Sequence, residues 1–173
     1  MAGGRRAGLP RPEPPLGDGE VRLRPWGEGG DGDALALAAA WNDPAVRRWS
    51  AGPPPERRNP TYAARWIDGE SDRRRRGLAL DLVIAPADPP ADTSVLGEVG
   101  LGPIDWRTMT AHIGWWVAGP ARGKGVAARA VALLARWAER ELALRVVAEV
   151  DPGNLASLRV AERAGVEVVN RTS

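Results

Sequence analysis

The stretch "GPARGKGVAARA" (Gly119–Ala130) decides the fold of this chain. It follows the apolar run "HIGWWVA" (His112–Ala118) and opens a segment with helical periodicity. Within it, Gly123 and Gly125 bracket Lys124. A glycine-rich turn at the start of a helix presents free backbone N–H groups and the positive end of the helix dipole. The turn therefore predicts a ligand that carries phosphate.

The P-loop is the first phosphate motif to compare with this turn. It needs four residues between its first glycine and the Gly-Lys pair, followed by Ser or Thr to bind magnesium. Only three residues separate Gly119 from Gly123, and Gly125 stands where Ser or Thr is required. The turn does not fit a P-loop.

The dinucleotide-binding fingerprint fits the spacing better. The pattern G-x-G-x-x-G/A is met by Gly123, Gly125 and Ala128, with Glu149 or Asp151 as the acid that follows the next strand. A Rossmann half would continue β-α-β beyond this point, and it would not follow three strands that look antiparallel. We keep this interpretation as the less favoured alternative.

The hydrophobic pattern predicts one α/β (α+β) domain over residues 20–173, with a mixed, mainly antiparallel sheet flanked by helices. The expected order is β-α-α-β-β-β-α-β-α-β. Short apolar runs predict strands at 21–26, 77–86, 94–105, 110–118, 144–150 and 166–170. Helical spacing predicts helices at 31–49 with a break near Pro44, and at 61–76 after Pro60, 126–144 and 155–164, with Asp31 or Asp33 as an N-cap. Residues 1–19, rich in Gly, Pro and Arg, are expected to form a disordered extension.

The composition excludes several classes of function. The 24 Lys+Arg and 22 Asp+Glu of the 173 residues leave a net charge of +2, which does not favour nucleic acid as a partner. Cysteine is absent and His112 is the single histidine, so we expect neither disulfides nor a bound metal. No apolar run reaches the ~20 residues of a membrane span. We therefore expect a cytoplasmic protein without a membrane partner.

Arg122 completes a more specific motif. Residues 122–127 match [Q/R]-x-x-G-x-[G/A], the acetyl-CoA signature of the GNAT acetyltransferase superfamily, which the chain resembles from about Val21 to Val169. The segment "VDPGNLASLRVAERAG" (Val150–Gly165) is similar to the N-x-x-S-x-x-x-x-x-x-x-G segment of the ribosomal-protein-alanine acetyltransferase branch. The resemblance implies the GNAT fold, acetyl-CoA as co-substrate and an amine as acceptor.

The resemblance also implies which residues bind the cofactor. The strand before the turn is expected to bulge and to splay from the next strand, and the pantetheine arm to lie in that opening. The N–H of Val117 would then polarise the thioester carbonyl. Asn154 is expected to contact the arm, although Asn also favours the N-cap of a helix. The expected cofactor-binding residues are Trp116, Val117, Ala118, Arg122, Gly123, Lys124, Gly125, Val126, Ala127 and Asn154.

The implied reaction is direct attack of a primary amine in a ternary complex, which requires a base and an acid. His112 and Glu98 are the two main candidate bases, with Asp105 as a weaker third, and each of the first two also has a purely structural interpretation. Many family members supply the acid from a Tyr, but Ala161 stands at that position. Ser157 is the remaining candidate, unless it is only the third residue of a helix.

The family normally continues past a Gly-Phe pair with two strands that form a hairpin. Here Val166 replaces the Phe, and we expect the hairpin to be incomplete. This feature and Ala161 favour an alternative function, an acyl-CoA-binding protein of the same fold with little or no catalysis. The acceptor is expected to be a protein N-terminus or a small-molecule amine. Dimers are common in the family, so a homodimer is compatible with the resemblance.

Overall fold

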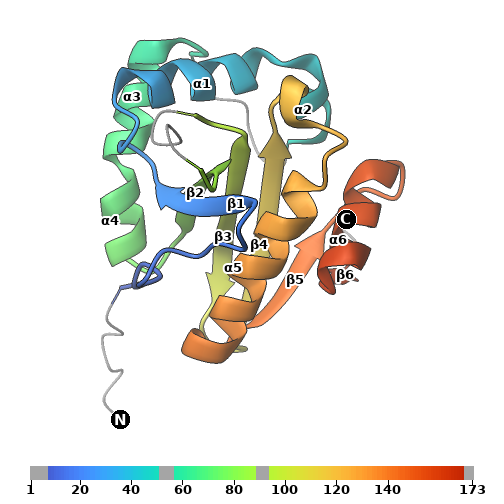
Figure 1. Ribbon diagram of the computed structural model, residues 1–173. Coiled ribbons are helices and arrows are strands. Elements are labelled where there is room, and N and C mark those ends of the chain that lie inside the picture. Colours follow the sequence, from blue (N-terminus) through green and yellow to red (C-terminus); the bar gives the residue numbers. More distant parts are fainter. Residues whose placement is uncertain (1–7, 51–56, 89–93, 170–173) are drawn as a thin grey trace.

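A six-stranded sheet organises the molecule, which the computed structural model describes over residues 8–50, 57–88 and 94–169 (Figure 1). The strands lie side by side in sequence order: β1 (Val21–Pro25), β2 (Leu80–Pro86), β3 (Gly97–Asp105), β4 (Thr110–Val117), β5 (Arg145–Glu149) and β6 (Glu167–Val169). Neighbours from β1 to β4 are antiparallel, whereas β5 is parallel to both β4 and β6. The predicted mixed, mainly antiparallel sheet is confirmed.

The helices follow the predicted order, but each of the first two predicted helices is divided into two shorter ones. The expected break at Pro44 separates α1 from α2, and a second break at Gly69, not predicted, separates α3 from α4. The helices are α1 (Asp31–Asn42), α2 (Pro44–Trp49), α3 (Pro60–Asp68), α4 (Glu70–Arg75), the 3₁₀ turn η2 (Gly119–Ala121), α5 (Val126–Leu142) and α6 (Leu155–Ala164). Across the described residues, no helix combines the length and apolarity needed to cross a membrane.

Helix α5 covers one face of the sheet. The stripe predicted from its spacing is buried, namely Val126, Ala130, Leu134, Trp137 and Ala138. These side chains pack against alternate strand residues: Leu80, Leu82, Ile84, Val99, Leu101, Ala111, Ile113, Val146 and Ala148. Because successive side chains of a strand point to opposite faces, the residues between them belong to the other face.

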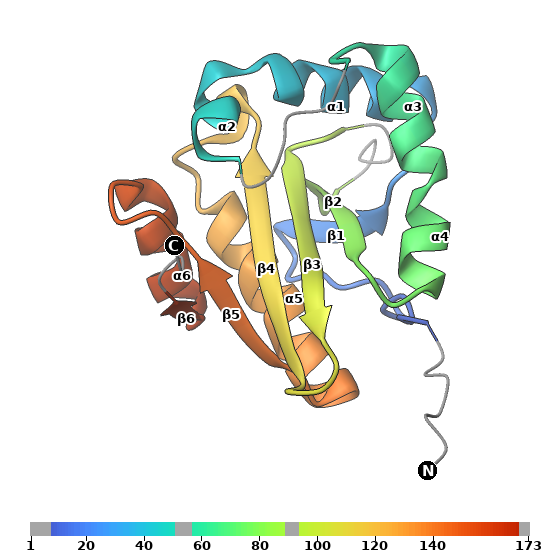
Figure 2. The same ribbon diagram turned by 180° about the vertical axis from the view of Figure 1, so that it is seen from behind.

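The other face of the sheet is covered only in part. Helices α1 and α3 close over Trp26, Val83 and Ala85 to form a second, smaller core. Seen from behind, β3, β4 and β5 carry no described helix over most of their length (Figure 2). Gly114, in the middle of β4, is exposed there. The candidate bases Glu98 and His112 lie on this face of the sheet.

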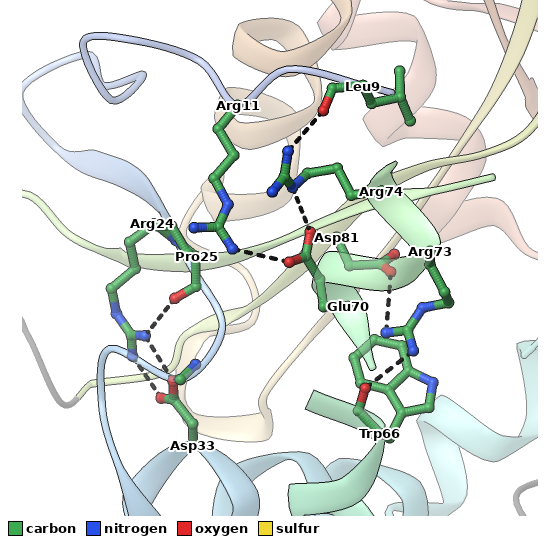
Figure 3. A network of polar contacts seen from close by, with 11 residues as sticks. Leu9, Arg11, Arg24, Pro25, Asp33, Trp66, Glu70, Arg73, Arg74 and Asp81 are labelled. Atoms are coloured by element: carbon green, nitrogen blue, oxygen red, sulfur yellow. Dashed lines mark hydrogen bonds and ion pairs between the residues drawn. The ribbon is translucent and has the colours of Figure 1, made fainter. Parts of the chain in front are cut away.

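Residues 8–19 differ from the disordered extension expected of them. Leu9 is 1% exposed, its N–H donates to Arg74 O at 2.9 Å, and its own carbonyl accepts from the Arg74 guanidinium at 2.8 Å (Figure 3). Arg11 forms a 2.9 Å ion pair with Glu70. The segment was predicted to be disordered because it is rich in Gly, Pro and Arg, but its apolar residue Leu9 is buried in the core. Residues 1–7 lie outside the described ranges.

A buried ion pair fixes the start of α1. Neither Asp31 nor Asp33 caps this helix, because the N-cap is Gly30 and it makes no side-chain capping bond. Asp33 is fully buried instead and accepts two hydrogen bonds from the Arg24 guanidinium, at 2.7 and 2.9 Å (Figure 3). Burial alone would raise the pKa of Asp33, but the bonds from Arg24 and from the Gly27 N–H outweigh it and lower that pKa.

Removing Asp33 should therefore destabilise the fold strongly. We expect Asp33→Ala to reduce the free energy of unfolding by about 3–5 kcal/mol, because the Arg24 charge would remain buried without a partner. Urea unfolding followed by circular dichroism measures the effect. Asp31→Ala, in the same helical turn but exposed, is the matched control. Equal losses in the two variants would contradict this role of the pair.

Candidate active site

Strands β4 and β5 pair at one end and part at the other. Their pairing ends at His112 and Val147, although β4 continues to Val117. From Val147 onward β5 pairs with β6 on its other side, and the two strands diverge (Figure 2). The edge of β4 from Ile113 to Val117 has no strand partner among the described residues. We call this edge the strand gap.

The expected splaying is thus present, but the expected bulge lies on a different strand. Between β3 and β4 the register shifts from the pair Leu101 and Ile113 to the pair Ile104 and Ala111. This step places the additional residue in β3, whereas the resemblance implied a bulge in β4 itself.

Only some backbone groups of β4 face the strand gap. The Ala118 N–H donates to Leu96 O at 2.8 Å, on the β3 side. Backbone groups alternate between the two edges of a strand, so those of Trp116 also face β3, and those of Val117 and Trp115 face the gap. Arg122 Nε donates to Val117 O at 3.0 Å, which agrees with this direction. Of Trp116, Val117 and Ala118, whose backbone was predicted to be exposed there, Val117 alone faces the gap, and the backbone of Trp115 faces it as well.

The glycine turn presents unpaired donors at the start of α5. Gly123 and Gly125 have φ angles of +75° and +76°, a region that side chains disfavour. No described residue accepts a hydrogen bond from the N–H groups of residues 123–128. A Cβ added at either glycine would meet nothing within 4 Å, so the space in front of the turn is free. These groups and the helix dipole can bind an anion.

Arg122 crosses from the turn to helix α2. Its guanidinium contacts Asp43 at 2.7 Å, in addition to Val117 O. Asp43 is the N-cap of α2 and accepts from the Ala45 N–H at 2.8 Å. The hydrogen bond from Arg122, followed by that from Ala45, lowers the pKa of Asp43. Arg122 therefore connects three elements beside the strand gap, and Lys124 is exposed next to it.

Asn154 and Ser157 lie at the start of α6. Asn154 is the N-cap of this helix, and its side-chain oxygen accepts from the Ser157 N–H at 3.1 Å. The capping role weighed for Asn154 is therefore present. Among the described residues, neither the Asn154 amide nitrogen nor the Ser157 hydroxyl has a hydrogen-bond partner, and both side chains are half-buried.

The two main candidate bases share one face of the sheet. Glu98 on β3 and His112, Gly114 and Trp116 on β4 all point away from α5, because their neighbours along each strand pack against it. We call these four residues the open face. Glu98 lies directly across from Trp116, and Gly114 leaves free space between Trp116 and His112.

Glu98 is held by two tryptophans. The indole N–H of Trp26 donates to one carboxylate oxygen at 2.8 Å, and that of Trp116 donates to the other at 3.2 Å. Burial, and then the charge of Asp81, raise the pKa of Glu98 to about 8, although the two indole bonds act against the rise. The carboxyl group is therefore able to exchange a proton near neutral pH.

His112 lies at the closed end of the strand gap. Its Nδ1 is 3.8 Å from a carboxylate oxygen of Glu149 on β5, and about a third of each side chain is exposed. His112 and Trp116 are four residues apart on β4, a separation of about 13 Å. The structure thus brings Glu98, and not His112, close to the end of β4 where Val117 faces the gap.

Three site residues escaped the sequence analysis. Trp26, which directly follows β1, and Asp81 on β2 come to Glu98 through the pairing of the strands. An acid inside the apolar run 77–86 was the one available signal for Asp81. Asp43 carried a signal too, since Asp before Pro is a common start of a helix. Within the described ranges, no group of three or more His, Asp or Glu could hold a metal.

Comparison with known proteins gives three findings. A family model described as "Acetyltransferase (GNAT) domain" matches residues 20–167. The probable N-acetyltransferase YjcK of Bacillus subtilis is 40% identical over 77 residues, which cover 43% of this chain and 42% of that protein. The match therefore spans less than half of this curated relative.

Solved structures extend the likeness over most of the chain. Mycobacterium smegmatis RimJ in complex with CoA-disulfide is 26% identical, with a TM-score of 0.66 over 86% of this chain and 71% of that one. The ribosomal-protein-S5-alanine acetyltransferase from Vibrio fischeri shares the fold at 20% identity, with a TM-score of 0.69 over 87% and 81% of the two chains.

The raised pKa of Glu98 should appear in the stability of the protein. Between 4.5, its ordinary value, and about 8, the unfolded chain has lost the Glu98 proton and the folded chain keeps it. Stability should therefore fall as pH rises through this window. Glu98→Gln cannot titrate at this position, so its stability should lack the part of this decrease that Glu98 causes. The variant loses one indole hydrogen bond, but it does so equally at every pH.

Urea unfolding at about pH 5 and about pH 9 measures this difference. Glu141→Gln is the matched control, because Glu141 is exposed on α5 and its one ion pair among the described residues is the 4.0 Å contact with Arg140. If the Glu98→Gln and wild-type stabilities change in parallel with pH, Glu98 does not titrate in this window.

Proposed function

The chain belongs to the acetyltransferase (GNAT) family, and we propose that it transfers an acetyl group from acetyl-CoA to a primary amine. One observation carries the proposal. The unpaired N–H groups of the glycine turn, the strand gap and the Glu98 carboxyl group gather around the same end of β4. The likeness to YjcK and to RimJ supports acetyl transfer from CoA.

The residues of the turn fit the pyrophosphate of CoA. In the proposed complex, the N–H groups of residues 123–127 bind its oxygens, and Lys124 adds a positive charge. Arg122 lies beside the turn and can share its guanidinium between Asp43 and a phosphate oxygen, because it has five N–H donors. The pantetheine arm would lie along the strand gap, with Asn154 on the opposite side.

Acetyl-CoA supplies an activated acyl group, and the protein residues hold the reacting atoms and move the protons. The Val117 N–H is directed at the gap and is suited to stabilise negative charge on the carbonyl oxygen. Glu98 accepts the proton that the amine loses as the N–C bond forms. When the C–S bond breaks, the Ser157 hydroxyl donates a proton to the leaving sulfur and recovers one from solvent.

We assign the base to Glu98 in preference to His112 on the basis of position. Glu98 is held against Trp116, the residue next to Val117. His112 lies about 13 Å further along β4, where the strands are still paired. The acceptor amine, from a protein N-terminus or a small molecule, would approach over the exposed Gly114.

Thiol release from acetyl-CoA, measured across a panel of amines and N-terminal peptides, tests the function. Turnover with at least one acceptor, and its loss in Glu98→Gln, supports the proposal. Binding of CoA without turnover on any acceptor supports the alternative, an acyl-CoA-binding protein of this fold. Ala161, buried where many family members carry Tyr, favours that alternative.

Gly125→Glu should abolish CoA binding. The new side chain would occupy the free space in front of α5, bring a negative charge and strain a backbone at φ +76°. We expect the Kd for CoA to rise by about 100-fold or more. Isothermal titration calorimetry measures the change. Gly119→Ala, in the same turn but without a positive φ, is the control, and unchanged affinity in Gly125→Glu would refute the pyrophosphate assignment.

Asp43→Asn should strengthen CoA binding. Asn preserves the N-cap of α2 but removes the charge that competes for Arg122. Solvent screens the charge of an exposed pair, so we expect a modest effect, a Kd lower by up to about fivefold. The gain should shrink at high ionic strength, because salt screens the exposed charges. A weaker affinity in Asp43→Asn would mean that Asp43 supports the cofactor site.

A further inference from the structure

A second carboxylate lies beside Glu98, and nothing in the proposed chemistry uses it. Asp81 on β2 is across from Gly100, two residues from Glu98 on β3, so the two acids are diagonal neighbours on one face. Such neighbours have Cβ atoms about 7 Å apart. Two neighbouring carboxylates that are both withdrawn from water are costly to the fold, and this cost suggests a role in the reaction.

Gly100 gives the Asp81 carboxylate its position. A Cβ added at Gly100 would lie only 2.6 Å from Asp81 Oδ1, which any other residue would displace. The carboxylate therefore lies over the β3 backbone, on the same face of the sheet as Glu98. Asp81 can occupy this position on β2 because the residue across from it on β3 is a glycine.

Arg73 from α4 approaches the same carboxylate. Its Nη2 is 3.7 Å from Asp81 Oδ2, which is an ion pair without a short hydrogen bond. The guanidinium is fixed by other contacts: it stacks 4.1 Å above the Trp66 ring, and Nη1 donates to Trp66 O at 3.0 Å (Figure 3). Arg73 therefore offsets the Asp81 charge only in part.

We propose that Arg73 and Asp81 are positioning residues for Glu98. The ion pair holds the Asp81 carboxylate over Gly100, and the charge that remains there governs how readily Glu98 gives up its proton. The inference rests on the proposed function in one respect only, namely that Glu98 is the base.

The directions of the pKa shifts agree with this geometry. Burial raises the pKa of Asp81 to about 6, the Arg73 charge lowers it, and the Glu70 charge raises it. The charge of Asp81 in turn raises the pKa of Glu98. The other charged groups on the elements around Glu98 are Arg22 and Arg24 on β1, Asp105 on β3, His112 on β4, Asp31 and Asp33 on α1, Arg65 and Asp68 on α3, and Glu70, Asp72, Arg74 and Arg75 on α4.

Two substitutions should move the titration of Glu98 in opposite directions. Asp81→Asn removes the negative neighbour and should lower the apparent pKa of Glu98 by about 1 unit. Arg73→Gln removes the positive neighbour and should raise it by a similar amount. Arg73→Lys keeps the charge and should restore the wild-type value. A purely structural role would lower activity in all three variants without moving this pKa.

Two readouts follow the titration. One is the tryptophan fluorescence of the protein without ligand, since Trp26 and Trp116 both bond to Glu98; the signal assigned to Glu98 is the one absent in Glu98→Gln. The other is the pH dependence of kcat/KM. Arg76→Gln is the matched control, because Arg76 is exposed on the same segment and, among the described residues, forms an ion pair with Asp72 alone.

If the pKa of Glu98 followed by fluorescence shifts in opposite directions in Asp81→Asn and Arg73→Gln, the positioning pair is supported, whatever the effect on activity. If kcat/KM shifts in parallel, Glu98 is the base as proposed. If fluorescence shifts and kcat/KM does not, the assignment of the base fails while the positioning pair stands. Shifts in the same direction, or no shift in either variant, would overturn the positioning pair.

Discussion

The parting of β4 from β5 is the constraint on which the rest of the site depends. The first residues of β5 pair with β4 and its last residues pair with β6, and Val147 pairs with both. A sheet edge is thereby opened inside the molecule, where backbone groups that would otherwise be paired face the strand gap. An open edge invites association with other chains. Here Arg122 bonds to the exposed Val117 carbonyl and, through Asp43, brings α2 to the end of the gap.

The alternation of side chains along β4 then places residues on the two faces of the sheet and backbone groups at the strand edge. Alternate residues of β4 pack under α5 or point to the open face, while the backbone of Val117 points along the sheet. A cofactor in the gap and an acceptor over Gly114 would therefore reach the same point from perpendicular directions. A shift of the β3–β4 register by one residue would move Glu98 into the α5 core.

Local features of this chain were predictable from sequence, and contacts between distant segments were not. The glycine turn, the stripe of α5 and the break at Pro44 follow from neighbouring residues, and the structure has all three. The burial of Leu9 and of Asp33 depends on partners at Arg74 and Arg24, which no local pattern identifies.

The candidate site divides along the same line. All of its proposed cofactor residues except Asn154 fall within the short stretch 116–127, whereas Trp26 and Asp81 come to Glu98 through pairings across β1, β2 and β3. A glycine facing an acid across two strands has no signature in a single sequence. The pair Gly100 and Asp81 became visible only when the register was known.

The same face of the sheet contains two Arg–Asp pairs, and their difference is informative. Arg24 makes two short hydrogen bonds to Asp33, and with the neighbouring N–H groups it keeps the pKa of that acid low despite complete burial. Arg73 stays 3.7 Å from Asp81, whose pKa is raised to about 6.

This fold can therefore neutralise a buried acid fully, and it does so where the acid only supports α1. Beside Glu98, Arg73 offsets the charge of Asp81 only in part, and the fold is less stable as a result. Buried structural ion pairs gain from close, bidentate geometry. A loose pair beside a carboxyl group that titrates near neutral pH is instead the arrangement expected of a catalytic site, where proton affinity and not stability is being set.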